Sequence, residues 1–178
     1  MSEDTCLTIS RRDALGRLAL AGSAGVVLLT IGGGSRIAYG QSVDGDLGIL
    51  SAALYLEHEA IAAYQAGAES KLLPDNVLKV AVAFQSDHKR HRDGIVGAIQ
   101  TLGGTPLEAE KRYRFGQLKS DKDILRLAYR LEQGAVDAYA TLASNIQNRT
   151  VLDYAAHVLA DEVRHATVLK SVLGMRNY

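Results

Sequence analysis

Apolar residues recur every three or four positions from Asp46 almost to the C-terminus, the spacing that gives a helix one buried face. Pro74 and Pro106 fall where this periodicity breaks, as expected for a residue that helix interiors exclude. We therefore predict an all-α domain and find no convincing strand. The predicted helices span about residues 46–69, 75–102, 121–147 and 150–173.

Several residues mark the ends of these helices. Asp75, Ser120 and Thr150 are of the types that cap helix N-termini. Gly103 and Gly174 suit the left-handed backbone position that closes a helix. We expect helix boundaries at these five positions.

The connection between the second and third predicted helices is long. It spans residues 103–119, which as extended chain can run the length of a bundle. A simple up-down-up-down bundle does not need such a crossover. We therefore predict an antiparallel four-helix bundle built from two helix pairs related by a two-fold axis, which should leave a repeat in the sequence.

An internal repeat does relate the two halves of the chain. Residues 56–64 align with residues 131–139 at an offset of 75, and five of the nine positions are identical. Residues 87–91 align with residues 161–165 at an offset of 74. In the first motif Glu precedes Tyr by seven residues, which is two helical turns, so the two side chains share a face. These pairs are Glu57 with Tyr64 and Glu132 with Tyr139.

Acidic and imidazole side chains interrupt helix faces that are otherwise apolar. His88 and His91 lie on the apolar face of the second predicted helix, and Glu162 and His165 lie on that of the fourth. Burying an ionised carboxylate without a partner is strongly unfavourable, and a bound cation is one partner that satisfies it. The Glu-x-x-His spacing of residues 162–165 is one that helical bundles use to hold paired iron or manganese.

This pattern resembles that of the ferritin-like superfamily, in particular exported bacterial ferritin-like domains, over nearly all of residues 46–173. The resemblance implies a ferritin-like bundle with a metal-centred activity. The metal ligands that it implies are Glu57, His88, His91, Glu132, Glu162 and His165. Two irons are expected first and manganese second, while a single zinc or copper ion stays an alternative. Tyr64 and Tyr139 would donate a hydrogen bond to a ligand carboxylate or carry an electron, the alternative being an ordinary core tyrosine.

One position departs from the superfamily's pattern. His88 stands where the motif in the second helix supplies a carboxylate that commonly bridges two metals. A neutral ring there removes one negative charge and one bridging oxygen, so two close dications would repel each other with less compensation. A single or asymmetric metal site is therefore an open alternative. Asp87 could replace the carboxylate or orient a ring, and the sequence does not decide between these roles.

The function implied by this resemblance is redox chemistry with dioxygen or peroxide, as in a ferroxidase or a protein that protects against oxidative stress. The alternative is a non-catalytic bundle that binds a metal or a partner protein at a degenerate site. In that alternative Arg90 and Arg164 would supply the cations of a buried salt network. A homo-oligomer is possible, and iron storage in a shell of subunits is a third possibility.

Residues 1–40 have the order of an export signal. Paired arginines at positions 11 and 12 precede a mostly apolar stretch, and Ala38 and Gly40 are small residues suited to a cleavage site. The segment resembles a twin-arginine signal. We expect cleavage before Gln41, a bundle domain at residues 41–178, and a periplasmic or otherwise exported protein without a stable membrane span. The alternative is a segment that is never cut and acts as an anchor.

The amino-acid composition limits which classes of partner the protein suits and which residue types can bind a metal. The 178-residue chain has 20 Lys plus Arg and 20 Asp plus Glu, so no net field favours nucleic acid. Its one cysteine, Cys6, excludes an intrachain disulfide and any Cys-rich zinc or iron–sulfur site. Metal ligands in the bundle must therefore be His and carboxylates.

Overall fold

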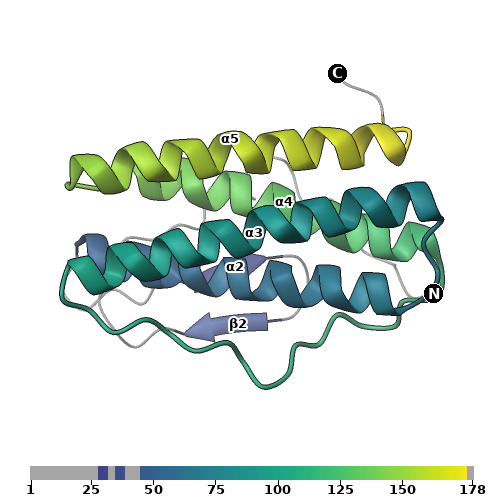
Figure 1. Cartoon of the computed structure of the whole chain (residues 1–178), viewed down its shortest axis with the longest axis horizontal. Coiled ribbons are helices and arrows are strands. Elements are labelled where there is room, and N and C mark those ends of the chain that lie inside the picture. Colours follow the sequence, from purple (N-terminus) through teal and green to yellow (C-terminus); the bar gives the residue numbers. More distant parts are fainter. Residues whose placement is uncertain (1–27, 32–34, 39–44, 176–178) are drawn as a thin grey trace, which may run out of the picture.

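The computed structural model describes residues 28–31, 35–38 and 45–175. Its main feature is an antiparallel bundle of four helices (Figure 1), which confirms the predicted fold. The helices are α2 (Asp46–Glu69), α3 (Asp75–Thr101), α4 (Asp121–Ala143) and α5 (Arg149–Val172). α2 packs chiefly against α3, and α4 chiefly against α5, while α2 meets α4 and α3 meets α5 between the pairs.

The chain between α3 and α4 runs without regular structure along the length of the bundle (Figure 1). Because of this crossover, α4 starts at the same end of the bundle as α3 and runs parallel to it. Tyr113 holds the crossover against α2, with its ring centroid 6.5 Å from that of Tyr55. His58 on α2 also reaches the crossover, since its Nε2 lies 3.2 Å from the carbonyl oxygen of Leu107.

Three of the five predicted helix boundaries are confirmed. The Ser120 side chain caps α4 by accepting a hydrogen bond from the N–H of Asp123. Gly103 and Gly174 adopt left-handed backbone, with φ of 78° and 66°. Asp75 is instead the first residue inside α3, and the cap position before it makes no side-chain hydrogen bond.

The junction between α4 and α5 differs from the prediction. α4 ends at Ala143 rather than near residue 147, in a segment where polar side chains bond to nearby backbone and compete with the helix. Thr150 is not the N-cap of α5. Asn148 is, because its side-chain oxygen accepts hydrogen bonds from the N–H groups of Thr150 and Val151.

Two short strands lie outside the bundle. β1 (Leu28–Ile31) and β2 (Ser35–Ala38) pair in antiparallel register, with Leu28 opposite Ala38. Both strands lie within residues 1–40, which the sequence analysis interpreted only as an export signal, and the prediction of an all-α domain from Asp46 onward is confirmed. The paired arginines and the expected cleavage site lie outside the described residues. No helix in the described part of the chain is long and apolar enough to cross a membrane.

The apolar core is divided into two clusters by a polar middle layer. One cluster lies toward the α4–α5 connection and includes Leu54, Ile95, Ile99 and Val158. The other lies toward the α2–α3 connection and is smaller, with Tyr64, Phe84, Leu125, Ala128 and Leu169. We call these two regions the α4–α5 end and the α2–α3 end.

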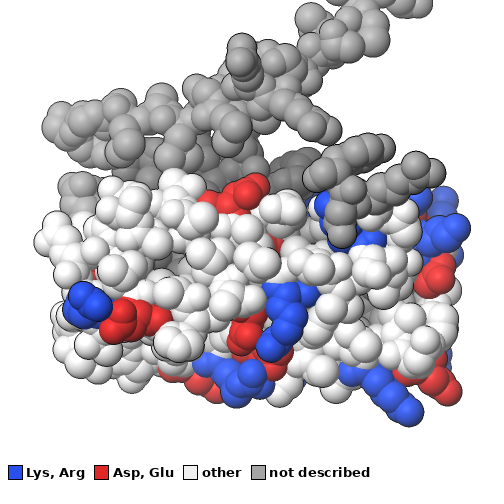
Figure 2. Space-filling view, turned by 90° about the horizontal axis from the view of Figure 1, so that it is seen from above, with Lys and Arg blue, Asp and Glu red and all other residues white. Residues whose placement is uncertain are grey.

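The outer surface carries charges of both signs. On the visible part of the face in Figure 2, basic and acidic side chains are interspersed among uncharged ones, and neither sign forms a large continuous area. On this face the distribution agrees with the balanced composition.

Candidate metal centre

The six predicted ligand residues meet in the polar middle layer of the bundle. α2 and α4 each contribute one glutamate, α3 contributes two histidines, and α5 contributes a glutamate and a histidine. They are Glu57, His88, His91, Glu132, Glu162 and His165, and none is more than 5% exposed.

The ligand atoms form two overlapping groups. Within each group the four atoms lie within 4.8 Å of one another. The first group is Glu57, His88, His91 and Glu162, and the second is His88, Glu132, Glu162 and His165. His88 and Glu162, which correspond to each other in the internal repeat, belong to both groups. The bundle therefore offers two adjacent four-residue positions for a cation.

Five buried atoms of this cluster have no hydrogen-bond partner among the described residues. They are Nδ1 of His91, Nδ1 of His165, one carboxylate oxygen of Glu132 and both carboxylate oxygens of Glu162. Buried polar atoms are nearly always hydrogen-bonded, so five orphans in one place need an explanation. Imidazole nitrogens and carboxylate oxygens are suitable donors for iron or manganese, so the residues present fit such an ion.

Two aspartates orient the histidine rings from outside the cluster. Nε2 of His91 lies 3.2 Å from a carboxylate oxygen of Asp161, and Nε2 of His165 lies 3.0 Å from one of Asp87. An Nε2–H that donates outward leaves the Nδ1 lone pair facing the cluster, as metal-ligating histidines require. Each aspartate belongs to the helix that faces its histidine across the bundle.

Sequence analysis left the role of Asp87 open and missed Asp161. The repeat could have identified both, because Asp161 corresponds to Asp87 and His165 corresponds to His91 at the same offset. Arg164 contacts both aspartates, at 2.9 Å and 3.1 Å. Arg90 also binds Asp87. The two arginines thus pair with these outer carboxylates and not with the buried glutamates.

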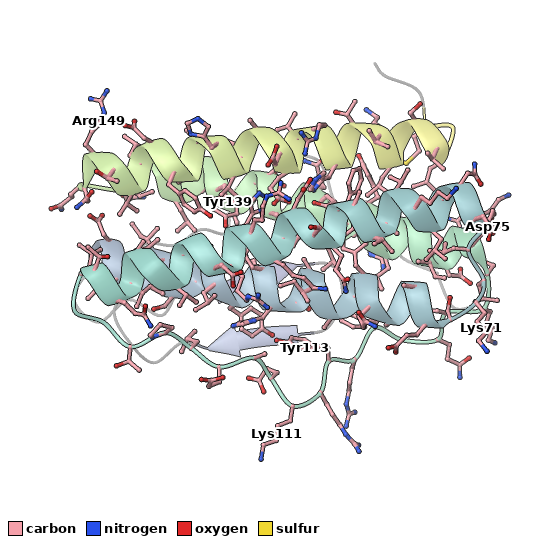
Figure 3. All side chains as sticks on the ribbon, viewed as in Figure 1. Lys71, Asp75, Lys111, Tyr113, Tyr139 and Arg149 are labelled. Atoms are coloured by element: carbon pink, nitrogen blue, oxygen red, sulfur yellow. The ribbon has the colours of Figure 1, made fainter. Side chains whose placement is uncertain are left out.

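Two buried tyrosines connect the two halves of the centre. The Tyr139 hydroxyl donates to a carboxylate oxygen of Glu57 at 2.6 Å, and the Tyr64 hydroxyl donates to one of Glu132. Burial, followed by the nearby carboxylates, raises the pKa of both phenols well above the usual value. Both therefore remain protonated donors. Figure 3 shows Tyr139 among the interior side chains, whereas Lys111 on the crossover points away from the bundle.

His88 lies at the centre of the cluster. Its Nδ1 is 2.8 Å from Glu57 and its Nε2 is 3.2 Å from Glu132, so the ring joins carboxylates from both halves. Burial alone disfavours the charged ring, but Glu132 and Glu57 outweigh burial and raise the pKa of His88 well above its usual value. The raised pKa favours the protonated, cationic ring at the position where the resemblance led us to expect a carboxylate.

The three glutamates differ in their ionisation. Burial raises the pKa of Glu162 well above its usual value. Burial also opposes ionisation of Glu57 and Glu132, but the neighbouring histidines outweigh it and lower the pKa of both carboxyls. These shifts favour the anionic form of Glu57 and Glu132 beside His88 and the protonated form of Glu162, whose proton a bound cation would displace.

The fold has known counterparts. A family model described as a ferritin-like domain matches residues 45–175. No protein of curated function matches the chain. A conserved hypothetical protein from Mycobacterium tuberculosis is 26% identical, with a TM-score of 0.66 over 73% of this chain and 91% of that chain.

Two further solved structures share the fold at lower identity. A ferritin-like, diiron-carboxylate protein from Bacillus anthracis is 22% identical, with a TM-score of 0.62 over 71% of this chain and 94% of that chain. A dodecameric thioferritin from Bacteroides fragilis is 23% identical, with a TM-score of 0.64 over 74% of this chain and 88% of that chain.

Proposed function

We propose, because the chain belongs to the ferritin-like domain family, that this protein holds two iron ions between its helices and uses them in redox chemistry with dioxygen or peroxide. The observation that carries the proposal is the set of orphaned ligand atoms arranged as two overlapping groups. The description of the Bacillus anthracis protein as a diiron-carboxylate protein supports iron over other metals. Manganese is the second choice because it prefers similar donors.

The internal repeat suggests a role for five of the six predicted ligand residues, the exception being His88. Glu57 and His91 would bind one ion, Glu132 and His165 the other, and Glu162 would contribute to both. Bound iron would supply the electrons and the Lewis acidity that reduction of dioxygen or peroxide requires. On metal binding, Glu162 would release the proton that its raised pKa retains.

The residues around the ligands would keep the centre in place. By accepting from Nε2–H, Asp161 and Asp87 would hold the histidine rings in the tautomer that leaves Nδ1 available to a bound ion. Tyr139 and Tyr64 each occupy one oxygen of a ligand carboxylate, which restricts how that carboxylate can rotate. The protein would thus supply orientation and a dry environment.

A small void between α2 and α4 adjoins the centre. It is lined by Glu57 and His88 on the inside, with Glu59 among its other lining residues. Its volume of about 10 Å³ suits one water-sized molecule. An oxidant of that size, such as dioxygen or peroxide, fits this void better than a larger organic substrate does.

His88 supports a second candidate function, a non-catalytic metal-binding bundle. Its ring contacts both Glu57 and Glu132 and, when protonated, could join the two carboxylates as a cation does, which is what a degenerate site would need. Under this candidate the centre binds one zinc or copper ion, or none, and performs no redox turnover.

Elemental analysis separates the two candidates. The full chain would be expressed with its N-terminal segment, purified without chelators, and assayed for metal per chain and for ferrous oxidation by dioxygen and by peroxide. About two irons or manganese ions per chain, with oxidation that Glu132→Ala abolishes in a folded protein, is the result expected from the proposal. About one zinc or copper per chain, with no oxidation after loading with ferrous iron, would establish the second candidate instead.

We also propose that the domain acts outside the cytoplasm. The support is the order of residues 1–40, with paired arginines, an apolar stretch and small residues before Gln41. Replacing both arginines by lysine should retain the protein in the cytoplasm at its unprocessed mass. Normal export of that variant would contradict a twin-arginine route.

A further inference from the structure

The α2–α3 end of the bundle contains a cavity that the metal centre does not use. Its volume is about 110 Å³, and side chains from all four helices line it, together with Leu73 of the turn. In Figure 3 the labelled residues Lys71 and Asp75 mark this end of the bundle, and Arg149 marks the opposite end. The corresponding void at the α4–α5 end is only about 10 Å³.

The internal repeat explains the difference between the two ends. Gly67 and Val80 line the large cavity, and their repeat counterparts Leu142 and Tyr154 line the small void. Tyr154 fills its end so closely that its hydroxyl packs against Gly94 and donates to backbone carbonyls of α3. Val80 is smaller than its counterpart Tyr154 and so leaves part of the α2–α3 end hollow. Gly67 does not add to this space, because a Cβ there would lie 2.8 Å from Cγ2 of Ile124.

The cavity is apolar on its inner side. The hydroxyl of Tyr64 is already engaged with Glu132, and Asn76 is exposed, so the other lining side chains are aliphatic or Phe84. A buried water needs two to four polar partners, which these walls do not provide. Exposed Val80 and Val172, at 38% and 52% of their full accessibility, belong to the same lining and give an apolar entrance.

The inner wall of the cavity is in contact with the metal-ligand residues. The ring of Phe84 stacks on that of His165, with centroids 3.9 Å apart. Tyr64 lies beside His88, with centroids 5.5 Å apart. A molecule in the cavity would therefore touch two rings that themselves contact the centre.

We propose that this cavity binds a small uncharged apolar molecule, an aromatic ring or short alkyl chain of about six carbon atoms, with Asn76 near any polar end group. The size follows from the volume, because an apolar cavity of roughly 150 Å³ is known to bind benzene. The site is built by apolar side chains of the folded bundle and does not depend on which metal the centre holds.

Calorimetric titration with toluene tests the proposal on the full chain as purified. The wild-type protein should bind one toluene per chain in a saturable manner. Ala128→Leu, which adds volume to the lining, should weaken binding by at least about tenfold, which corresponds to roughly 1.4 kcal/mol. Ala156→Leu, at an exposed position of α5, is the matched control and should bind as the wild type does. If Ala128→Leu fails to fold, Ala81→Leu fills the same cavity from α3.

The two phenylalanines of the chain provide an independent readout of location. Phe84 lines the cavity, whereas Phe115 stacks on Tyr113 in the crossover. In chelator-treated protein labelled with ¹³C-phenylalanine, toluene should shift the ring resonances of Phe84 and leave those of Phe115 unchanged. No saturable binding, equal binding by Ala128→Leu, or a shift of Phe115 alone would overturn the proposal.

Discussion

The two halves of the bundle, α2 with α3 and α4 with α5, share a ligand pattern but differ at two places. At the centre, His88 in one half corresponds to Glu162 in the other. At the ends, the region near the α4–α5 connection is filled, and the region near the α2–α3 connection is hollow. The repeated residues around these differences still form matched pairs, in which Tyr139 and Tyr64 each bond a glutamate of the opposite half.

In a bundle built from two related halves, side chains that contact the opposite half are constrained more strongly than side chains that pack at one end. Groups that contact the opposite half must keep their type, since changing one leaves a buried partner unsatisfied. Side chains at the bundle ends pack within one end, so they can change in size independently. His88 is the exception, because it contacts both halves and yet differs from its counterpart.

The largest effect is expected from replacing the two central residues separately. Glu162→Ala should reduce the affinity for iron by more than about 100-fold, because it removes a carboxylate from both ligand groups. His88→Ala should retain metal, because it removes a cation that competes for Glu57 and Glu132. Metal titration with circular dichroism as the fold control measures both. Equal loss in the two variants would mean that position 88 is a ligand like its counterpart.

Replacing His88 by Glu would place a carboxylate at the same position in both halves. The change should lower the stability of the metal-free protein and increase the stabilisation that bound metal provides. His88→Glu adds a fourth buried carboxylate, so the metal-free protein should lose about 3 to 5 kcal/mol of unfolding free energy. Two bound irons per chain should restore the lost stability, so the rise in Tm on metal binding should be larger than in the wild type. His88→Gln is the control without added charge, and an equal rise in Tm for that variant would contradict the prediction.

Replacing either of the two outer aspartates should have a smaller effect. Asp161→Asn and Asp87→Asn each weaken the acceptor that fixes a histidine tautomer, so iron affinity should fall by about 10- to 100-fold. Asp87 should give the larger loss because it is more buried and contacts two arginines, Arg90 and Arg164. Arg92→Gln, on the same helix but paired with Asp93, is a suitable control. Unchanged affinity in both aspartate variants would show that the rings need no external support.

The smallest effects are expected from the same Ala→Leu substitution made separately at each end of the bundle. Ala53 and Ala128 correspond in the repeat and are both buried. Ala53→Leu overpacks the filled end and should destabilise by about 1 to 3 kcal/mol. Ala128→Leu enters a cavity that itself destabilises the fold by about 2 to 3 kcal/mol, so stability should stay level or rise. Urea unfolding compares the two, and a similar loss in both would mean that the α2–α3 end is not hollow.

The fold could be predicted from sequence because its determinants are local and periodic. Helical spacing of apolar residues located α2 to α5, and the length of the segment after Gly103 identified the crossover. The sequence predictions were wrong or incomplete where local hydrogen bonds or local strand pairing compete with the predicted structure. Asn148 replaced Thr150 as the cap of α5, and a hairpin formed in a segment interpreted only as an export signal.

The sequence alone determined which residues face the interior, because helical periodicity and the repeat place Glu57, Glu132, Glu162 and the three histidines on apolar faces. Only the tertiary structure decided how they meet. It placed His88 between two carboxylates, aligned Asp161 with a ring on another helix, and left a cavity beside Phe84. These features depend on distances between side chains of different helices and on the volumes around them, and the spacing of residues along one helix does not specify either.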